Sequence, residues 1–259
     1  MPGTASGLRS NPAARLAALQ LERPEWARWL ALLSEIRREL DDQQWQPHDQ
    51  TIHLDTGRAQ HLVHRLADAA AIGYRPDRSE VRRLLAAAIR EDESELTKLA
   101  AEGGIDPGVL SAVARLAIVP VLRGYSRGFV SPAWRHGHCP ACGSWPTLAE
   151  RRGLDRSRWL RCGRCCAGWE VEPLWCSYCG ERDHRQLGSL VVDGAGDTLK
   201  VDTCESCRGY LKSVAVLQAL PPFELLLQDL ETVELDLIAV NRGYVRPERR
   251  GFPVDLRIT

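Results

Sequence analysis

The sequence predicts an α+β protein with an N-terminal all-helical domain, two tandem four-cysteine modules of the zinc-ribbon or rubredoxin-like type, and a C-terminal helix. Three observations favour this fold class. All nine cysteines of the 259-residue chain lie between Cys139 and Cys207. Helix-period hydrophobic patterns dominate the residues before them, and short apolar runs typical of strands separate the cysteines. We expect a helical domain at 1–132, metal-binding ribbons at 133–210, and a C-terminal helix and tail at 211–259.

The segment before the cysteines is predicted to form a helical bundle or array over residues 10–130, without an internal repeat. Its helices are marked by start signals: Pro24 suits a first helical position, and Asp77 followed by Glu80 resembles a capping box. Asp106 followed by a proline is a further start signal. Five helices are expected: one after Pro24, one over 58–72, one after Asp77, one over 92–101 that stops at Gly103-Gly104, and one after Asp106.

Two helical segments are expected after the cysteines. Residues 209–219 are predicted to be helical. Beyond Pro221-Pro222, a last amphipathic helix is expected from the spacing of Phe223, Leu226, Leu227, Leu230, Val233, Leu237 and Ile238. The tail after Asn241 is basic and interrupted by proline, so we expect it to be irregular.

Composition favours a globular, cytoplasmic protein. The chain is 44% hydrophobic, and its 34 basic residues equal its 34 acidic ones, which argues against a nucleic-acid partner. We expect no apolar run of the roughly 20 residues needed for membrane insertion, and the N-terminus lacks a signal peptide's apolar segment. In a reducing compartment, closely spaced cysteines predict metal ligands or redox groups rather than disulfides.

Four Cys-x-x-Cys pairs carry the main chemistry of the sequence. Two cysteines three positions apart in a tight turn direct both sulfur atoms towards one ion. Gly143 and Gly180 directly follow two of the pairs, where the turn needs a left-handed backbone angle. The pairs are Cys139/Cys142, Cys162/Cys165, Cys176/Cys179 and Cys204/Cys207.

Each pair supplies half of a tetrahedral shell, so pairs must combine. Nineteen residues separate the first pair from the second, and 24 separate the third from the fourth. Both gaps fit a β-hairpin that brings two turns together. Sequential matching predicts two sites, each for one iron or zinc ion: Cys139, Cys142, Cys162 and Cys165 in the first, and Cys176, Cys179, Cys204 and Cys207 in the second. The alternative is a cross-braced arrangement, in which the first Cys-x-x-Cys pair shares a site with the third.

Cys166 is left over from these pairs. We interpret it as a small, semi-buried thiol, with ligation in place of Cys165 or a redox role as alternatives. Histidines near the turns (His136, His138 and His184) are expected to lie on the surface or beside the ligands, because four cysteines already complete a tetrahedron. The tryptophans around the turns are expected to pack in the core rather than stack on nucleic-acid bases.

The cysteine motifs resemble those of a known family. The succession CPACGSWP, RCGRCCAGWEV, CSYCGERD and CESCRGYLKSV is similar to the FdhE family of formate dehydrogenase accessory proteins. The stretch DLETVELDLIAVNRGY resembles that family's C-terminal helix, so the resemblance covers about residues 139–245. The sequence departs from the family in the doubled Cys165-Cys166 and in its arginine-rich tail beyond Gly243.

This resemblance implies a cytoplasmic maturation factor that binds the molybdenum- or tungsten-dependent catalytic subunit of formate dehydrogenase, with iron or zinc in its cysteine sites. It implies no enzyme activity of its own. The residues agree with this, because no nucleophile–base constellation, phosphate-binding glycine loop or paired-carboxylate motif stands out. Closed four-cysteine shells also leave no open metal position for a substrate.

Two other functions stay open at this point. A rubredoxin-like redox protein would hold iron, which cycles between two oxidation states, in its four-cysteine sites. A zinc-ribbon nucleic-acid-binding protein would use the basic cluster from Arg151 to Arg164, although acidic and basic residues balance over residues 139–210.

Overall fold

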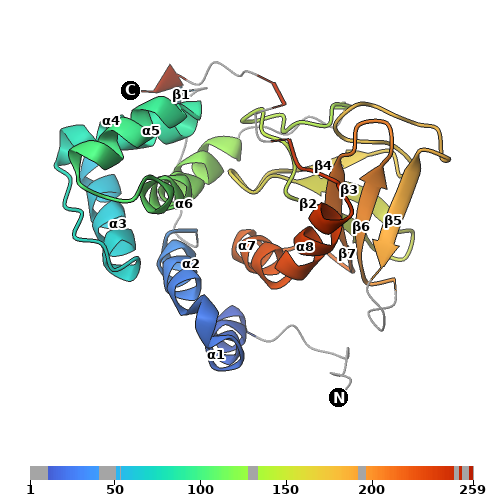
Figure 1. Cartoon of the computed structure of the whole chain (residues 1–259), viewed down its shortest axis with the longest axis horizontal. Helices are drawn as coiled ribbons and strands as arrows, with labels where there is room; N and C mark the ends of the chain where they lie inside the picture. Colours follow the sequence, from blue (N-terminus) through green and yellow to red (C-terminus); the bar gives the residue numbers. More distant parts are fainter. Residues whose placement is uncertain are drawn as a thin grey trace. The chain divides into compact units, whose positions relative to one another are not determined.

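The computed structural model describes residues 11–40, 51–52, 54–127, 134–191, 197–247, 251–252 and 257–258. These residues belong to two compact units (Figure 1). The helical unit contains the described residues up to 127 together with 257–258 near the C-terminus. The sheet unit contains the described residues from 134 to 252. The helices that precede the cysteines and the cysteines themselves therefore lie in different units.

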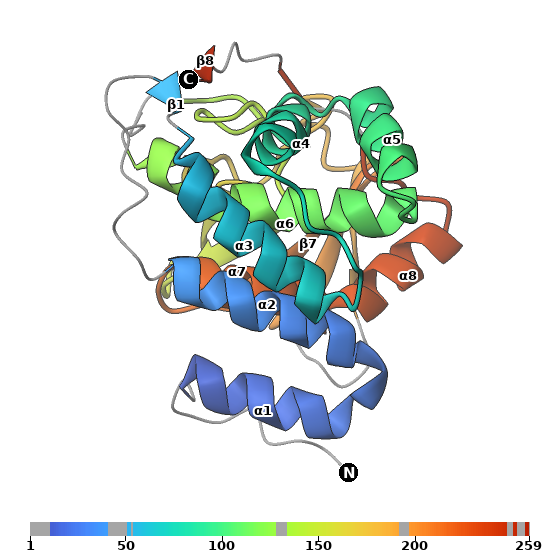
Figure 2. The ribbon, with the colours of Figure 1, turned by 90° about the vertical axis from the view of Figure 1, so that its left-hand side faces the viewer.

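The helical unit is organised around one long helix. Its elements are α1 (Pro12–Glu22), a 3-10 turn (Pro24–Trp26), α2 (Ala27–Leu40), α3 (Thr56–Ala69), α4 (Arg78–Arg90), α5 (Glu93–Glu102) and α6 (Pro107–Ser126). Helix α6 contacts α2, α3, α4 and α5, and Figure 2 shows it running through the middle of the unit. A two-residue strand, β1 (Thr51–Ile52), pairs in parallel with β8 (Arg257–Ile258).

Two of the three helix start signals are confirmed, whereas Pro24 begins the 3-10 turn that precedes α2. The Asp77 carboxylate accepts a hydrogen bond from the Glu80 backbone N–H at 2.9 Å, and the Glu80 carboxylate accepts one from the Asp77 N–H at 2.8 Å. Asp106 caps α6 by accepting from the Val109 N–H at 3.0 Å. Such caps satisfy backbone donors that have no partner inside the helix. Helix α1, which begins after the capping residue Asn11, was not expected as a separate element.

The expectation that no apolar run reaches membrane-spanning length is wrong for α6. This helix has 20 residues and an apolar composition that would suit a bilayer. However, 61% of its apolar window is buried within the structure, as is usual for the central helix of a globular protein. Its length and hydrophobicity follow from its packing against four other helices.

The sheet unit contains a single six-stranded sheet rather than two separate small sheets. Its strands are β2 (Leu148–Arg152), β3 (Ser157–Arg161), β4 (Gly168–Val171), β5 (Leu187–Val191), β6 (Leu199–Cys204) and β7 (Tyr210–Val216). The spatial order is β4-β3-β2-β7-β6-β5. Each cysteine module supplies three antiparallel strands, and the parallel pairing of β2 with β7 joins the modules.

The helix predicted over residues 209–219 is wrong, because most of this segment forms β7. The segment contains good helix formers, but both of its edges are hydrogen-bonded, to β2 on one side and to β6 on the other. Tertiary pairing therefore overrides local helix propensity. Strand β7 also runs across the boundary expected between residues 210 and 211.

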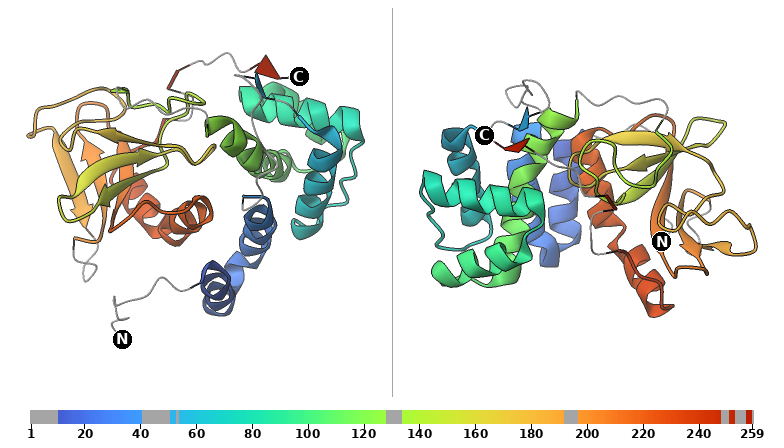
Figure 3. Two further views of the ribbon diagram at one scale, coloured as in Figure 1. Left: turned by 180° about the vertical axis from the view of Figure 1, so that it is seen from behind. Right: turned by 90° about the horizontal axis from the view of Figure 1, so that it is seen from above.

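The C-terminal helix is present as two shorter helices, α7 (Pro222–Glu231) and α8 (Val233–Asn241). They meet at Thr232, whose hydroxyl donates to the Gln228 carbonyl at 2.7 Å. Figure 3 shows both helices on one face of the sheet. The core beneath them is formed by Val201, Tyr210, Leu235, Ala239 and Tyr244, with Leu190, Leu199 and Ile238 at its edge.

Candidate metal centres

The four cysteine pairs lie in turns of one shared backbone geometry. In every turn, the N–H of the first cysteine donates to the carbonyl two positions after the second cysteine. These bonds are Cys139–Ser144 at 2.8 Å, Cys162–Ala167 at 3.0 Å, Cys176–Glu181 at 2.9 Å and Cys204–Gly209 at 3.0 Å. The repeated bond fixes each turn, so that both of its sulfur atoms lie on the same side.

The residue directly after each second cysteine has a left-handed backbone. Gly143 has φ 72° and Gly180 has φ 81°, as the motifs predict. Cys166 and Arg208 occupy the same position in the other two turns, with φ values of 57° and 58°. The leftover cysteine is therefore the turn-closing residue of its motif. Its side chain is only 2% exposed, and its Sγ lies 4.0 Å from the Pro222 carbonyl oxygen.

The structure brings the cysteines together in the sequential arrangement. Within each group, the sulfur atoms lie within 4.8 Å of one another. The first group, called site one, contains Cys139, Cys142, Cys162 and Cys165, and the second, site two, contains Cys176, Cys179, Cys204 and Cys207. The cross-braced alternative is not what the fold forms, and Cys166 lies outside site one. Whether each group ligates a metal stays a prediction.

The distances within each group suit a tetrahedral ion. Bonds of about 2.3 Å from zinc to sulfur place the ligand sulfur atoms about 3.8 Å apart. In site one, three sulfur–sulfur distances are 3.4, 3.5 and 3.7 Å, so this group is slightly more compact than the ideal zinc site. In site two, Cys176 and Cys207 are 3.7 Å apart, as are Cys179 and Cys204. Four thiol donors with no other ligand type in the group match zinc or iron rather than calcium or magnesium.

Burial and neighbouring thiols shift the pKa values of the site-one cysteines. Burial raises the pKa of Cys139 and of Cys165 well above the usual thiol value. Hydrogen bonding from the neighbouring thiols Cys139, Cys162 and Cys165 instead lowers the pKa of Cys142 well below it. Burial therefore opposes deprotonation of Cys139 and Cys165. A metal ion supplies the positive charge that full deprotonation requires.

The two sites differ in exposure. All four cysteines of site one are buried. In site two, Cys179 is exposed and Cys207 is half-buried, and burial raises the pKa of Cys176 to about 11. Site two therefore includes an exposed cysteine residue, whereas all four cysteine residues of site one are enclosed by protein.

The histidines near the turns lie outside both cysteine groups. His136 and His138 stack with ring centroids 5.2 Å apart, and His138 also stacks on Phe252 at 5.1 Å. The Trp169 indole N–H donates to the His136 carbonyl at 3.0 Å. These rings pack beside site one, in agreement with the expectation that they surround the ligands.

The basic cluster from Arg151 to Arg164 is divided between the two faces of the sheet. Arg161 donates to the fully buried Glu150 carboxylate on the face that α7 covers, and also to the Leu220 carbonyl at 3.0 Å. Arg151 and Arg158 project from the opposite face, since side chains alternate along a strand. The cluster therefore does not form one continuous basic surface.

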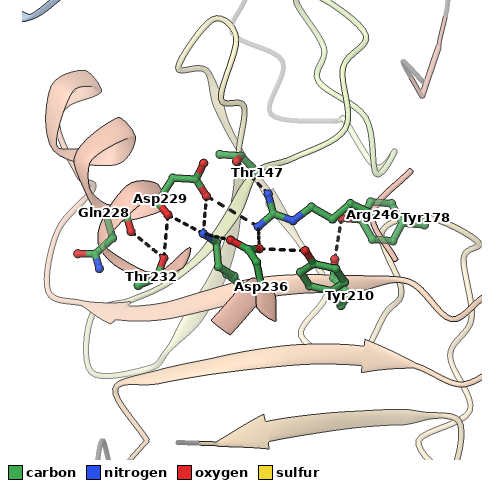
Figure 4. Close-up of polar contacts among 9 residues, drawn as sticks. Thr147, Tyr178, Tyr210, Gln228, Asp229, Thr232, Asp236 and Arg246 are labelled. Carbon is green, nitrogen blue, oxygen red and sulfur yellow. Dashed lines mark hydrogen bonds and ion pairs between the residues drawn. The ribbon is translucent and has the colours of Figure 1, made fainter. Parts of the chain in front are cut away.

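A second buried charged cluster links the sheet to α7 and α8 (Figure 4). Lys212 on β7 has no exposed side-chain surface, and its Nζ atom lies 2.7 Å from a carboxylate oxygen of Asp229 and 2.8 Å from one of Asp236. Arg246 approaches Asp236 to 2.7 Å, and the Tyr210 hydroxyl donates to Asp236 at 3.0 Å. No motif in the sequence indicates this cluster. Two features could have indicated it: Lys212 within the apolar run of β7, and Asp236 within the apolar helix α8.

The residues of site two fall within a recognised domain. Residues 174–251 match the family model described as "FdhE, C-terminal domain". The resemblance to the FdhE family is confirmed. The matched segment contains the four site-two cysteines, strands β5 to β7 and both C-terminal helices, whereas site one precedes it.

Curated FdhE homologues match parts of the chain. The homologue from Stutzerimonas stutzeri is 36% identical over 42% of this chain and 35% of its own length. The homologue from Pseudomonas aeruginosa is 33% identical over 53% of this chain and 46% of its own length. The homologue from Aquifex aeolicus is 27% identical over 57% and 53%, respectively. The chain thus spans about half or less of the length of these curated relatives.

The FdhE fold extends over nearly the whole chain. The crystal structure of the FdhE protein from Pseudomonas aeruginosa superposes with a TM-score of 0.59 and covers 92% of each chain at 22% identity. This likeness establishes the shared fold, including a helical region before the cysteine modules.

Proposed function

We propose that this chain is a cytoplasmic accessory factor that binds the catalytic subunit of formate dehydrogenase and supports formation of the active enzyme, without catalysing a reaction itself. The FdhE C-terminal domain over residues 174–251 carries this proposal. The two four-cysteine groups that the structure brings together also support it. Closed thiolate shells suit a stable binding scaffold better than a substrate-activating centre.

We further propose that all eight cysteines of sites one and two are metal ligands. An iron or zinc ion in each group would crosslink two turns that lie about 20 residues apart in the sequence, and its binding energy would stabilise the folded sheet unit. Zinc would supply only this structural stabilisation, whereas iron would also provide a one-electron couple.

Co-purification of the full, metal-loaded chain with the catalytic subunit encoded in the same genome tests the accessory role. We expect association with this subunit and reduced formate dehydrogenase activity when the factor's gene is deleted. The Cys179→Ser variant should restore less activity than Cys166→Ser, which makes the same chemical change outside the cysteine groups. Failure to associate, together with normal enzyme activity in the deletion strain, would contradict the proposal.

A redox function is the second candidate, and the exposure of Cys179 favours it at site two. Electron transfer needs a centre near the protein surface, and among the eight ligand candidates the one exposed residue, Cys179, belongs to site two. Elemental analysis and visible absorption of anaerobically purified protein decide this point. Colourless protein that contains only zinc would exclude the redox function at these sites.

A further inference from the structure

A cavity of about 370 Å³ lies beside site two in the sheet unit. Strands β2, β3, β5, β6 and β7 contribute to its lining, and the loop from Pro173 to Tyr178 forms one wall. Its volume falls within the range of about 300–1,000 Å³ that is typical of small-molecule pockets. The accessory role proposed above does not account for this cavity.

The lining of the cavity carries an excess of positive charge. Four basic side chains line it, with Asp202 as the single carboxylate: Arg151, Arg156, Arg158 and Lys200. Asp197, outside the lining, lies 2.8 Å from Arg151 and 3.8 Å from Arg156. With both aspartates counted, four positive charges still face two negative ones. An anion would balance this excess.

Two buried polar groups in the lining have unused hydrogen-bonding capacity. The Arg158 side chain is 7% exposed, and its Nη1 donates to the Trp175 carbonyl at 2.7 Å. Its Nη2 lies 3.4 Å from Asp202, but its buried Nε has no hydrogen-bond partner within the described parts of the chain. The Ser177 hydroxyl, also buried, is likewise unpaired among those residues. Buried donors are normally satisfied, so these two residues leave polar atoms without a partner in the wall of the cavity.

Apolar side chains complete the lining. Leu174, Leu187, Leu211 and Trp175 contribute carbon surface next to the basic groups. A bare inorganic ion would leave this surface unused, whereas a ligand with a carbon skeleton would cover it. We propose that this cavity binds a small organic oxyanion, a phosphate ester or carboxylate that carries an aromatic or aliphatic group.

The positive lining also has a competing explanation. Cys176 and Cys204 of site two contribute to the same cavity, and four thiolates around a divalent ion leave a net negative charge. In that case, the basic residues would stabilise the metal centre and no ligand would be needed. Metal content must therefore be measured together with anion binding.

Calorimetric titration of the full, metal-loaded chain with phenyl phosphate tests the proposal. The test variant is Arg156→Gln/Lys200→Gln, which removes two charges from side chains that are 48% and 22% exposed and so spares the buried Arg158. The matched control is Lys98→Gln/Arg115→Gln, which makes the same charge change on exposed side chains of the helical unit.

We expect phenyl phosphate to bind, phenol not to bind, and inorganic phosphate to bind more weakly. The test variant should weaken phenyl phosphate binding by about tenfold or more, since two charge-assisted hydrogen bonds are lost, and the control variant should leave it unchanged. Equal binding by both variants would overturn the proposal. Binding of a polyglutamate peptide without binding of phenyl phosphate would overturn it in favour of a protein-docking site. Loss of site-two metal in the test variant, with no anion binding by the unmodified chain, would overturn it in favour of metal stabilisation.

Discussion

The Lys212 ammonium group lies 2.8 Å from the Asp236 carboxylate, in a position where the lysine side chain has no exposed surface. Lys212 also donates to the Asp229 backbone carbonyl at 2.7 Å. A lysine is almost never fully buried unless its charge is paired. These two contacts connect the central strand β7 to both C-terminal helices, through Asp229 on α7 and Asp236 on α8. They therefore help to fix the positions of the helices on the sheet.

Replacement of Lys212 by methionine should destabilise the sheet unit by about 1–3 kcal/mol, because two partly buried carboxylates would lose one of their two compensating cations and keep only Arg246. Urea unfolding of the metal-loaded chain, followed by tryptophan fluorescence, measures this change. Five of the eight tryptophans lie after residue 133, so this signal is dominated by the sheet unit. Lys98→Met is the control, since its side chain is 64% exposed. Equal midpoints for the two variants would contradict the structural role of the buried lysine.

Single cysteine substitutions should remove one metal each and leave the helical unit folded. Cys142→Ser and Cys179→Ser should each retain about half of the metal, and the site-one variant should lose more stability because its site is fully buried. Elemental analysis gives the metal content, and limited proteolysis reports the folding of each unit. If both variants keep full metal content and protease resistance, the ligand assignment is wrong.

The adjacent cysteines Cys165 and Cys166 offer a matched comparison. Cys165→Ser should release the site-one metal, because its sulfur belongs to the group of four. Cys166→Ser should keep the metal, since Cys166 closes the turn through its backbone. Titration of free thiols before and after chelation gives an independent count of the ligands. Metal loss from the Cys166 variant alone would reverse the assignment.

The helical unit should become less stable at strongly alkaline pH. Burial, followed by the nearby Glu80 carboxylate, raises the pKa of Tyr74 from 10.0 to about 12. The folded protein therefore retains a proton that the unfolded chain releases between pH 10 and 12. Over this window, the free energy of unfolding should fall by up to about 1.4 kcal/mol per pH unit.

Tyr74→Phe removes the ionisable group and should flatten this pH dependence. Circular dichroism at 222 nm, which mainly follows the helices, measures the stability of both proteins across the window. Identical slopes for the two proteins would show that another group is responsible.

The elements predictable from sequence were those fixed by local chemistry. Asp77 and Glu80 predict the start of α4, because a capping box depends only on residues close in the sequence. The cysteine turns are equally local, and Gly143 and Gly180 indicate the left-handed backbone conformation of the residue that closes two of these turns. The pairing of the turns followed from the hairpin-length gaps between them.

The features that depend on distant partners were not predictable in the same way. Residues 210–216 contain good helix formers, and only pairing on both edges makes them a strand. Glu150 and Lys212 are charged residues that are fully buried, and only partners from other elements explain their burial. The cavity beside site two combines residues from both sheet halves, so no single motif indicates it.

The parallel pairing of β2 with β7 has a consequence for the order of folding during synthesis. Strand β2 finds one neighbour, β3, almost immediately, but its other neighbour is the last strand of the second module. Until Tyr210–Val216 has emerged from the ribosome, β2 keeps an open hydrogen-bonding edge next to a nascent cysteine cluster. A fragment that ends before β7 would retain the same open edge and is therefore expected to aggregate, even with all the ligand candidates of site one present.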